Sequence, residues 1–126
     1  MNREILFRGK RKDNGEWVFG FYYESERYRK KVHRIYNWIT HLHYDVIPET
    51  VGQYTELSAY NGDKIFDGDI INIFERKIEN AVVYWDDLFV GWHAKNKNEP
   101  LISLFKTIHE NYEVIGNIHD NPELLE

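Results

Sequence analysis

The chain has 126 residues, of which 42% are hydrophobic and 29% charged, and it contains no cysteine. This length is enough for one compact core or two small lobes, and it excludes most large enzyme scaffolds. The composition also excludes a disordered chain, disulfide bonds, cysteine-ligated zinc and thiol chemistry. Aromatic residues make up 16% of the chain, which favours β structure because rings fit a pleated, half-buried surface.

The formal charge of −5 is unevenly distributed along the chain. Residues 1–34 hold ten Lys and Arg against five Asp and Glu, a net +5, whereas residues 35–126 hold six against sixteen, a net −10. Such a split can steer a charged partner or favour head-to-tail self-association, and it also arises from two ordinary solvated faces. The N-terminus lacks a signal-peptide apolar region and no apolar run reaches the roughly 20 residues of a spanning helix, so we expect a cytoplasmic protein without membrane contact.

The first half of the sequence predicts strands. Apolar and aromatic residues alternate with other residues at 4–8 and 17–23, and Asn14-Gly15 between them is a strong hairpin signal. Gly20 is expected where a neighbouring backbone approaches closely. Residues 24–31 are charged and predict a loop or hairpin tip, and residues 32–39 and 42–47 predict two further strands. The aromatic rings on these strands are assigned to core and sheet packing.

The second half has tighter turns. Residues 48–55 predict a connector, with a subdomain boundary near 48–58, and the turns Asn61-Gly62 and Asp67-Gly68 precede a strand at 70–74. A two-residue loop at Asp86-Asp87 would join strands 81–85 and 88–92 and pair Trp85 with Leu88, Val83 with Val90, and Ala81 with Trp92.

The end of the chain is less uniform. Residues 101–109 suit a short helix or a strand equally well, because their apolar residues fit both spacings. Residues 112–118 predict a last strand, and Pro122 opens one helical turn. The predicted fold is therefore mostly β, a small antiparallel barrel or sandwich with SH3-like barrel character in the C-terminal half and at most one or two short helices. We expect one domain over 1–126, with an N-terminal β lobe over 1–50 and a C-terminal barrel lobe over 51–126.

The chemistry-bearing residues fall into three groups. The first group is a basic and aromatic segment that could contact phosphates and stack bases, could contact an acidic protein surface, or could be a solvated hairpin tip. Its candidate binding residues are Arg27, Tyr28, Arg29, Lys30, Lys31 and Arg34. His33 and Tyr36 lie beside them in the sequence, and Arg8, Lys10, Arg11 and Lys12 could extend the group. His41, His43 and Asp45 alternate along a strand and are weak metal candidates, since the wet side of an ordinary strand gives the same pattern. Asp63, Asp67 and Asp69 lack EF-hand spacing and are expected to cap turns.

Three blocks and the opening residues carry a family resemblance. The segments 46–55 (VIPETVGQYT), 61–71 (NGDKIFDGDII) and 112–125 (YEVIGNIHDNPELL), together with 3–8 (REILFR), closely resemble the signature blocks of the YopX family in their order. The resemblance implies a small phage- or prophage-encoded protein whose biochemical role is not established, and it carries over no catalytic residue. The segment 24–43 departs most from the family pattern, because it is longer and more basic than that pattern leads us to expect.

We therefore expect a cytoplasmic accessory protein that acts by binding a host or phage protein and needs no cofactor. The first alternative is a nucleic-acid-binding module that uses the basic segment 27–34. The second alternative is a metal-dependent hydrolase at His41, His43 and Asp45. An enzyme is not expected, because the sequence contains neither a Gly-x-Ser-x-Gly elbow nor a phosphate-binding Gly-rich loop. Exposed edge strands and the charge split also allow a homo-oligomer.

Overall fold

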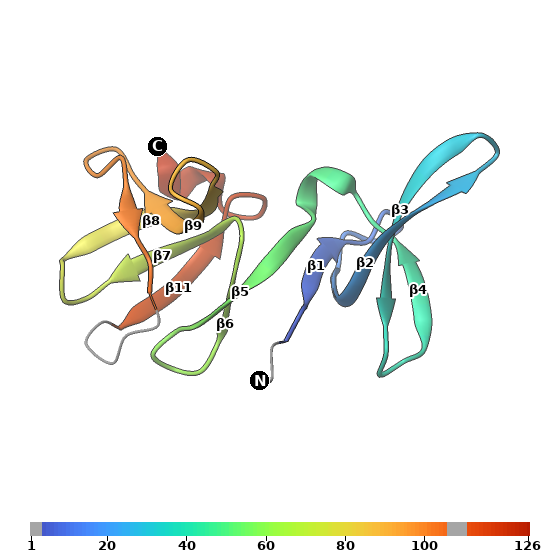
Figure 1. Ribbon diagram of the computed structural model, residues 1–126, viewed down its shortest axis with the longest axis horizontal. Coiled ribbons are helices and arrows are strands. Elements are labelled where there is room, and N and C mark those ends of the chain that lie inside the picture. Colours follow the sequence, from blue (N-terminus) through green and yellow to red (C-terminus); the bar gives the residue numbers. More distant parts are fainter. Residues whose placement is uncertain (1–3, 106–110) are drawn as a thin grey trace. The chain divides into compact units, whose positions relative to one another are not determined.

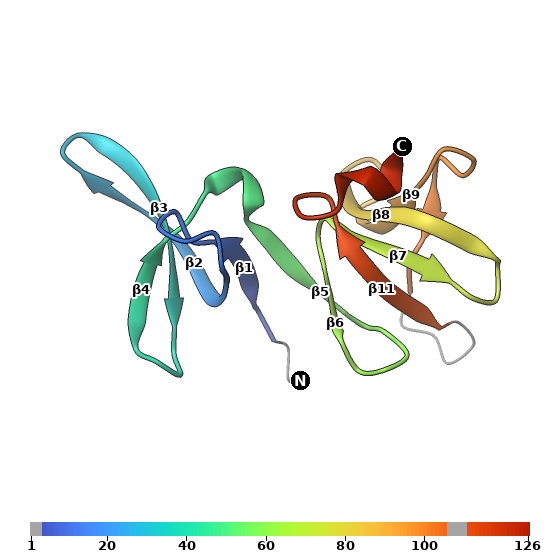
Figure 2. The ribbon, with the colours of Figure 1, turned by 180° about the vertical axis from the view of Figure 1, so that it is seen from behind.

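The computed structural model describes residues 4–105 and 111–126, and the chain divides into two compact units, 1–54 and 55–126. Figures 1 and 2 show both units from opposite sides. The described residues are mostly β, as predicted, with short 3-10 turns as their helical elements. They form two antiparallel sheets that are open rather than closed into a barrel, so the barrel alternative is wrong. No helix in the described ranges is long and apolar enough to cross a membrane.

The N-terminal unit is built on four consecutive antiparallel strands in the order β4-β3-β2-β1. Its elements are β1 (Phe7–Lys10), β2 (Trp17–Arg27), β3 (Lys30–Asn37), β4 (Leu42–Asp45), the 3-10 turn η1 (Pro48–Thr50) and the start of β5 (Gly52–Ser58). The beginning of β5 pairs with β1, and the rest of this strand continues into the C-terminal unit. All of the strands predicted for this half are therefore present, with small shifts at their ends.

Two of the hairpins in this unit were predicted from their turns. The predicted Asn14-Gly15 turn is confirmed, with Gly15 at a φ of +73°, and it joins β1 to β2. The charged segment 24–31 is confirmed as a hairpin, but its strands run almost to the tip, where Tyr28 and Arg29 make the turn. Both tip residues have positive φ, +53° and +63°, a conformation that asparagine and glycine adopt more easily. Figure 1 shows this hairpin extending beyond β1 and β4.

The core of the N-terminal unit is small and lies on one side of its sheet. Ile35 and Val46 are fully buried, and Gly9 leaves room for them, since a Cβ there would lie 3.2 Å from both side chains. In the first predicted strand, Leu6 is buried and Ile5 is exposed, so neighbouring residues differ in burial as the alternation predicts. The period-two pattern is thus correct, and the pattern alone could not tell which side was inside.

The C-terminal unit contains the second sheet, with strand order β10-β9-β8-β7-β11, beside the pair formed by β5 and β6. Its elements are β6 (Lys64–Phe66), β7 (Asp69–Ile73), β8 (Ile78–Asp86), β9 (Gly91–Lys95), β10 (Ile102–Ser103), β11 (Tyr112–Asn117) and the 3-10 turn η2 (Pro122–Leu125). The predicted turns at Asn61-Gly62 and Asp67-Gly68 are confirmed, as is the turn that Pro122 begins. An aliphatic cluster fills this unit, with Ile65, Ile71, Ile73 and Val83 fully buried.

The predicted β8–β9 hairpin is wrong in its loop and its register. The β8–β9 loop has four residues, 87–90, so Trp85 pairs with Trp92 and Val83 with Ala94 rather than with Leu88 and Val90. The longer loop forms because the Asp86 carboxylate accepts two backbone hydrogen bonds from it. Of the two structures left open for 101–109, residues 102–103 form a strand, β10, along β9, and residues 106–110 lie outside the described ranges.

Candidate functional site

A row of aromatic side chains covers the side of the N-terminal sheet that faces away from Ile35. The register pairs Phe21 with Tyr36 and Tyr36 with His43, and cross-strand partners share a face of the sheet. We define the aromatic face as the side that carries these three residues together with Trp17, Phe19 and Tyr23. The rings contact one another along it, with centroids 4.8 Å apart for Tyr36 and His43 and 5.6 Å for Tyr23 and His43.

Part of the aromatic face is open to solvent. Phe19 is 41% and Phe21 50% exposed, and Trp38 in the β3–β4 turn, 40% exposed, lies with its ring 4.8 Å from that of Phe21. The assignment of these rings to core packing is therefore wrong, because the only inward side of this small sheet is already filled by Ile35 and Val46. Sequence reasoning missed Trp38 and its neighbour Ile39, although two large apolar residues beside a turn were a signal for an exposed patch.

Cations accompany the rings on this face. Among the residues of β1 to β4, the register places on it one carboxylate, Asp45, and five cations, namely Arg8, Lys10, Arg27, Lys30 and Arg34. The Arg8 guanidinium lies 4.6 Å and the Lys10 ammonium 5.5 Å from the centroid of the Trp17 ring, which is a cation–π geometry. Lys31 belongs to the opposite side, where its ammonium lies 3.2 Å from Glu24. The face is therefore both aromatic and positively charged.

An open groove lies beside the aromatic face, where the β1–β2 turn meets β4. The backbone N–H of Lys12 donates to the Asp45 carbonyl, and Arg11 forms a β-bridge with Val46, so the two basic segments of the sequence come together. We call this space, of about 540 Å³, the edge groove; its lining residues are Arg11, Lys12, Asp13, Arg27, Arg34, Leu42, His43, Tyr44 and Asp45. Four cations and two carboxylates line it, which leaves it net positive.

Carboxylates hold several of the predicted binding cations in place. Asp45 accepts from Arg34 Nε at 2.8 Å and from Arg27 Nη1 at 3.2 Å, so one carboxylate joins β2, β3 and β4. The Arg11 guanidinium bonds Asp13 and holds the pKa of that carboxyl below its ordinary value. These cations are fixed in position by their partners. By contrast, Tyr28, Arg29 and Lys30 project at the exposed hairpin tip.

The predicted metal candidates do not share one site. His43 Nδ1 lies 2.6 Å from the Tyr23 hydroxyl and His41 Nδ1 lies 3.1 Å from the Tyr36 hydroxyl, while Asp45 is occupied by arginines. His41 is in the turn before β4, with a φ of +59°, so it does not continue the alternation of the strand. Within residues 4–105 and 111–126, no group of three His, Asp or Glu could hold a metal ion.

Two aspartates of the second half cap turns. Asp69 is buried and its Oδ2 accepts from the backbone N–H of Phe66 at 2.7 Å, which closes the turn around Gly68. Asp63 accepts from the Asn61 side chain at 3.1 Å within the preceding turn. These contacts agree with the turn-capping interpretation for the two residues.

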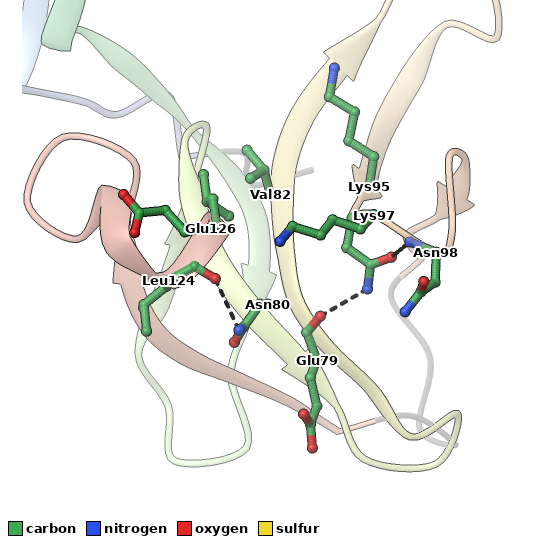
Figure 3. A pocket seen from close by; sticks show the side chains of 10 residues that line it. Glu79, Asn80, Val82, Lys95, Lys97, Asn98, Leu124 and Glu126 are labelled. Atoms are coloured by element: carbon green, nitrogen blue, oxygen red, sulfur yellow. Dashed lines mark hydrogen bonds between the residues drawn. The ribbon is translucent and has the colours of Figure 1, made fainter.

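The C-terminal unit has a pocket of its own, of about 440 Å³, shown in Figure 3. The C-terminal turn η2 closes one side of it, where the Asn80 amide donates to the Leu124 carbonyl at 3.0 Å. On the other side the Asn96 amide donates to the Glu79 carbonyl at 2.8 Å. Lys95 and Lys97 line the pocket opposite Glu79 and Glu126, so its charges are mixed. Its polar groups join β8, β9 and η2, and we assign it a structural role.

Comparison with known proteins gives one informative match. No curated protein matches the chain. A family model described as YopX protein matches residues 6–126, which is nearly the whole chain and includes both units. The match confirms the resemblance that the blocks at 46–55, 61–71 and 112–125 indicated. The chain belongs to the YopX family.

Proposed function

We propose that the chain is a phage-type accessory protein that acts by binding, without catalysis, and that it recognises an acidic region of a host or phage protein. The contact surface is the aromatic face with its bordering edge groove. The observation that carries the proposal is the exposed ring cluster of Phe19, Phe21 and Trp38 on the same side of the sheet as four exposed or half-buried cations, Lys10, Arg27, Lys30 and Arg34. Exposed aromatic residues and arginines are the residue types enriched at protein interfaces.

Two features favour a protein over a polyanion as the partner. Ile39, which follows Trp38 in the β3–β4 turn, is 81% exposed, and an aliphatic side chain contributes to a protein contact but offers no ring on which a base could stack. In addition, Arg27 and Arg34 already bond Asp45, which reduces the positive charge that phosphates would meet. A partner with apolar side chains and a few carboxylates matches this surface better than a uniform row of phosphates.

Capture from host or infected-cell lysate, followed by titration of the purified partner, tests this proposal. The face variant carries Phe21→Ser and Trp38→Ser, and the matched control carries Phe74→Ser, an exposed ring of the C-terminal unit. Because interface rings commonly contribute 1–2 kcal/mol or more each, we expect the face variant to bind about tenfold more weakly or worse, and the control to bind like wild type. Equal loss in both variants, or no loss in the face variant, would contradict the proposal.

A second candidate is a single-stranded nucleic acid in the edge groove. It is favoured by four cations, Arg11, Lys12, Arg27 and Arg34, around one open space that also contains the Tyr44 ring. Fluorescence titration of single- and double-stranded oligonucleotides at low and moderate salt tests it. Binding that falls steeply with salt and is lost in Lys12→Glu would support this candidate, whereas failure to bind at low salt would remove it.

A further inference from the structure

The β8–β9 loop presents a continuous apolar tip. Leu88, Phe89 and Val90 are 83%, 59% and 72% exposed, and Trp85, at the end of β8, is 45% exposed with its ring 5.3 Å from that of Trp92. Three consecutive large apolar residues on an exposed hairpin tip are unfavourable in water unless another surface covers them.

The loop is held in this outward conformation. Asp86 Oδ1 accepts from the backbone N–H groups of Leu88 and Phe89, both at 2.9 Å. Val90 has a φ of +48°, which a β-branched residue rarely adopts, and Gly91 then re-enters the sheet opposite Asp86. The apolar side chains are thus fixed by the fold before any contact forms, and preorganised surfaces lose less entropy on binding.

The charge around the loop is negative. Asp87 is exposed at the base of the tip, beside Asp86. The C-terminal unit as a whole, residues 55–126, holds six Lys and Arg against fourteen Asp and Glu, a net −8, whereas residues 1–54 hold ten against seven, a net +3. The loop therefore combines apolar side chains and carboxylates, the combination that the proposed function assigns to the partner of the aromatic face.

We propose that the apolar tip of the β8–β9 loop docks on the aromatic face of a second copy of the chain. This inference rests on the proposed function, because it names one partner of the same face. Charge complementarity favours this occupant over an anionic lipid surface, which the acidic unit would repel. Leu88 and Phe89 would contact the exposed rings of Phe19 and Phe21, with Asp87 near the cations of that face.

The two surfaces differ, so the contact is heterologous, and a pair of copies keeps one unused loop and one unused aromatic face. Unless the rotation closes a ring, such contacts add copies without limit. We therefore expect the average mass of the wild-type protein to grow with concentration at low salt. The growth should be smaller at 1 M salt, where screening reaches about 3 Å.

Mixing two full-length variants tests the contact. The loop variant carries Leu88→Ser and Phe89→Ser, and a second face variant carries Phe19→Ser and Phe21→Ser. The control is Tyr60→Ser, which is 59% exposed, as Phe89 is, and lies outside both surfaces. Mass is measured by light scattering and sedimentation, and folding by circular dichroism. We expect each variant alone to remain monomeric, their equimolar mixture to stop at two chains, and the control to assemble like wild type.

Several outcomes would overturn the inference: a wild-type protein that stays monomeric at low salt, a variant that assembles alone like wild type, or a mixture that stays monomeric. Should the double variants fail to fold, Asp87→Lys, which leaves the Asp86 bonds intact, is expected to weaken assembly at low salt, and no change would overturn it. If assembly fails while the face variant Phe21→Ser, Trp38→Ser still loses a captured partner, the proposed function stands alone. If that variant keeps its partner, the proposed function fails whether or not the chain assembles.

Discussion

The two units of this chain differ in which large apolar side chains they bury and which they expose. The C-terminal unit buries isoleucine, valine and leucine in one cluster, with Ile65, Ile71 and Ile73 fully inside. The N-terminal unit buries few apolar residues, chiefly Leu6, Ile35 and Val46, and leaves several rings on an open sheet face. Most of the buried side chains of the C-terminal unit are aliphatic, whereas the rings of the N-terminal unit are half-buried or exposed.

This difference affects how each unit is stabilised. Burial of the aliphatic cluster removes apolar surface from water, the dominant favourable contribution in folding. The N-terminal unit instead depends more on the ladders of β1 to β4, on ring contacts and on the ion pairs of Asp45. Such a sheet tolerates change on its outer face better than a packed core does.

Truncation of the aliphatic core should give the largest effect. Ile71→Ala removes a fully buried side chain from the C-terminal cluster and leaves a cavity, so the free energy of unfolding should fall by about 2–5 kcal/mol. Ile39→Ala, the matched change at an 81% exposed position, should alter it by less than about 0.5 kcal/mol. Urea denaturation followed by circular dichroism measures both values. Equal losses of stability in the two variants would contradict the burial of Ile71 in the core.

A backbone contact in the N-terminal unit should give the next largest effect. A Cβ at Gly20 would collide with the backbone carbonyl of Tyr36 on β3, so Gly20→Ala forces the strands apart. We expect a loss of about 1–3 kcal/mol and faster amide exchange along β2 and β3. Gly91→Ala is the control, since its Cβ would lie 3.6 Å from His93, an ordinary contact. Stability unchanged in Gly20→Ala would contradict the close approach.

Much of the fold could be predicted because local signals and tertiary structure agree. Asn14-Gly15 and Asn61-Gly62 form turns at the predicted places, and alternation located most strands. The errors have identifiable causes. The β8–β9 register differs from the predicted one because Asp86 caps a four-residue loop, and the two hydrogen bonds that its carboxylate accepts from the backbone are not visible in an apolar alternation pattern. For residues 101–109 the sequence left helix and strand open, and 102–103 form a strand because β9 offers an edge, which is a tertiary effect.

The candidate site could be predicted only in part. The basic segments were evident in the sequence, and the structure brings Arg11 and Lys12 to the same groove as Arg27 and Arg34. The pairing of Arg27 and Arg34 with Asp45 depends on strand register, and so does the side of the sheet on which the rings lie. Period-two patterns specify which residues share a face, but the solvent-exposed face is decided by the residues that fill the other side, here Ile35 and Val46.

The smallest effect concerns the loop that distinguishes the C-terminal unit. Backbone N–H donors, first that of Phe89 and then that of Leu88, hold the pKa of Asp86 below its ordinary value. A carboxyl with a lowered pKa in the folded state stabilises the fold above its unfolded pKa of about 3.9, and this stabilisation is lost as pH falls through the lower folded value. Protection of the Leu88 and Phe89 amides should therefore decrease in acid, as measured by NMR hydrogen exchange corrected for intrinsic rates.

Asp86→Asn keeps the carbonyl acceptor without the titrating group and should retain protection with no such acid transition, whereas Asp86→Ala should lose protection at every pH. A loop that stays protected in Asp86→Ala would mean that the strained backbone at Val90, and not the carboxylate, holds the apolar tip outward.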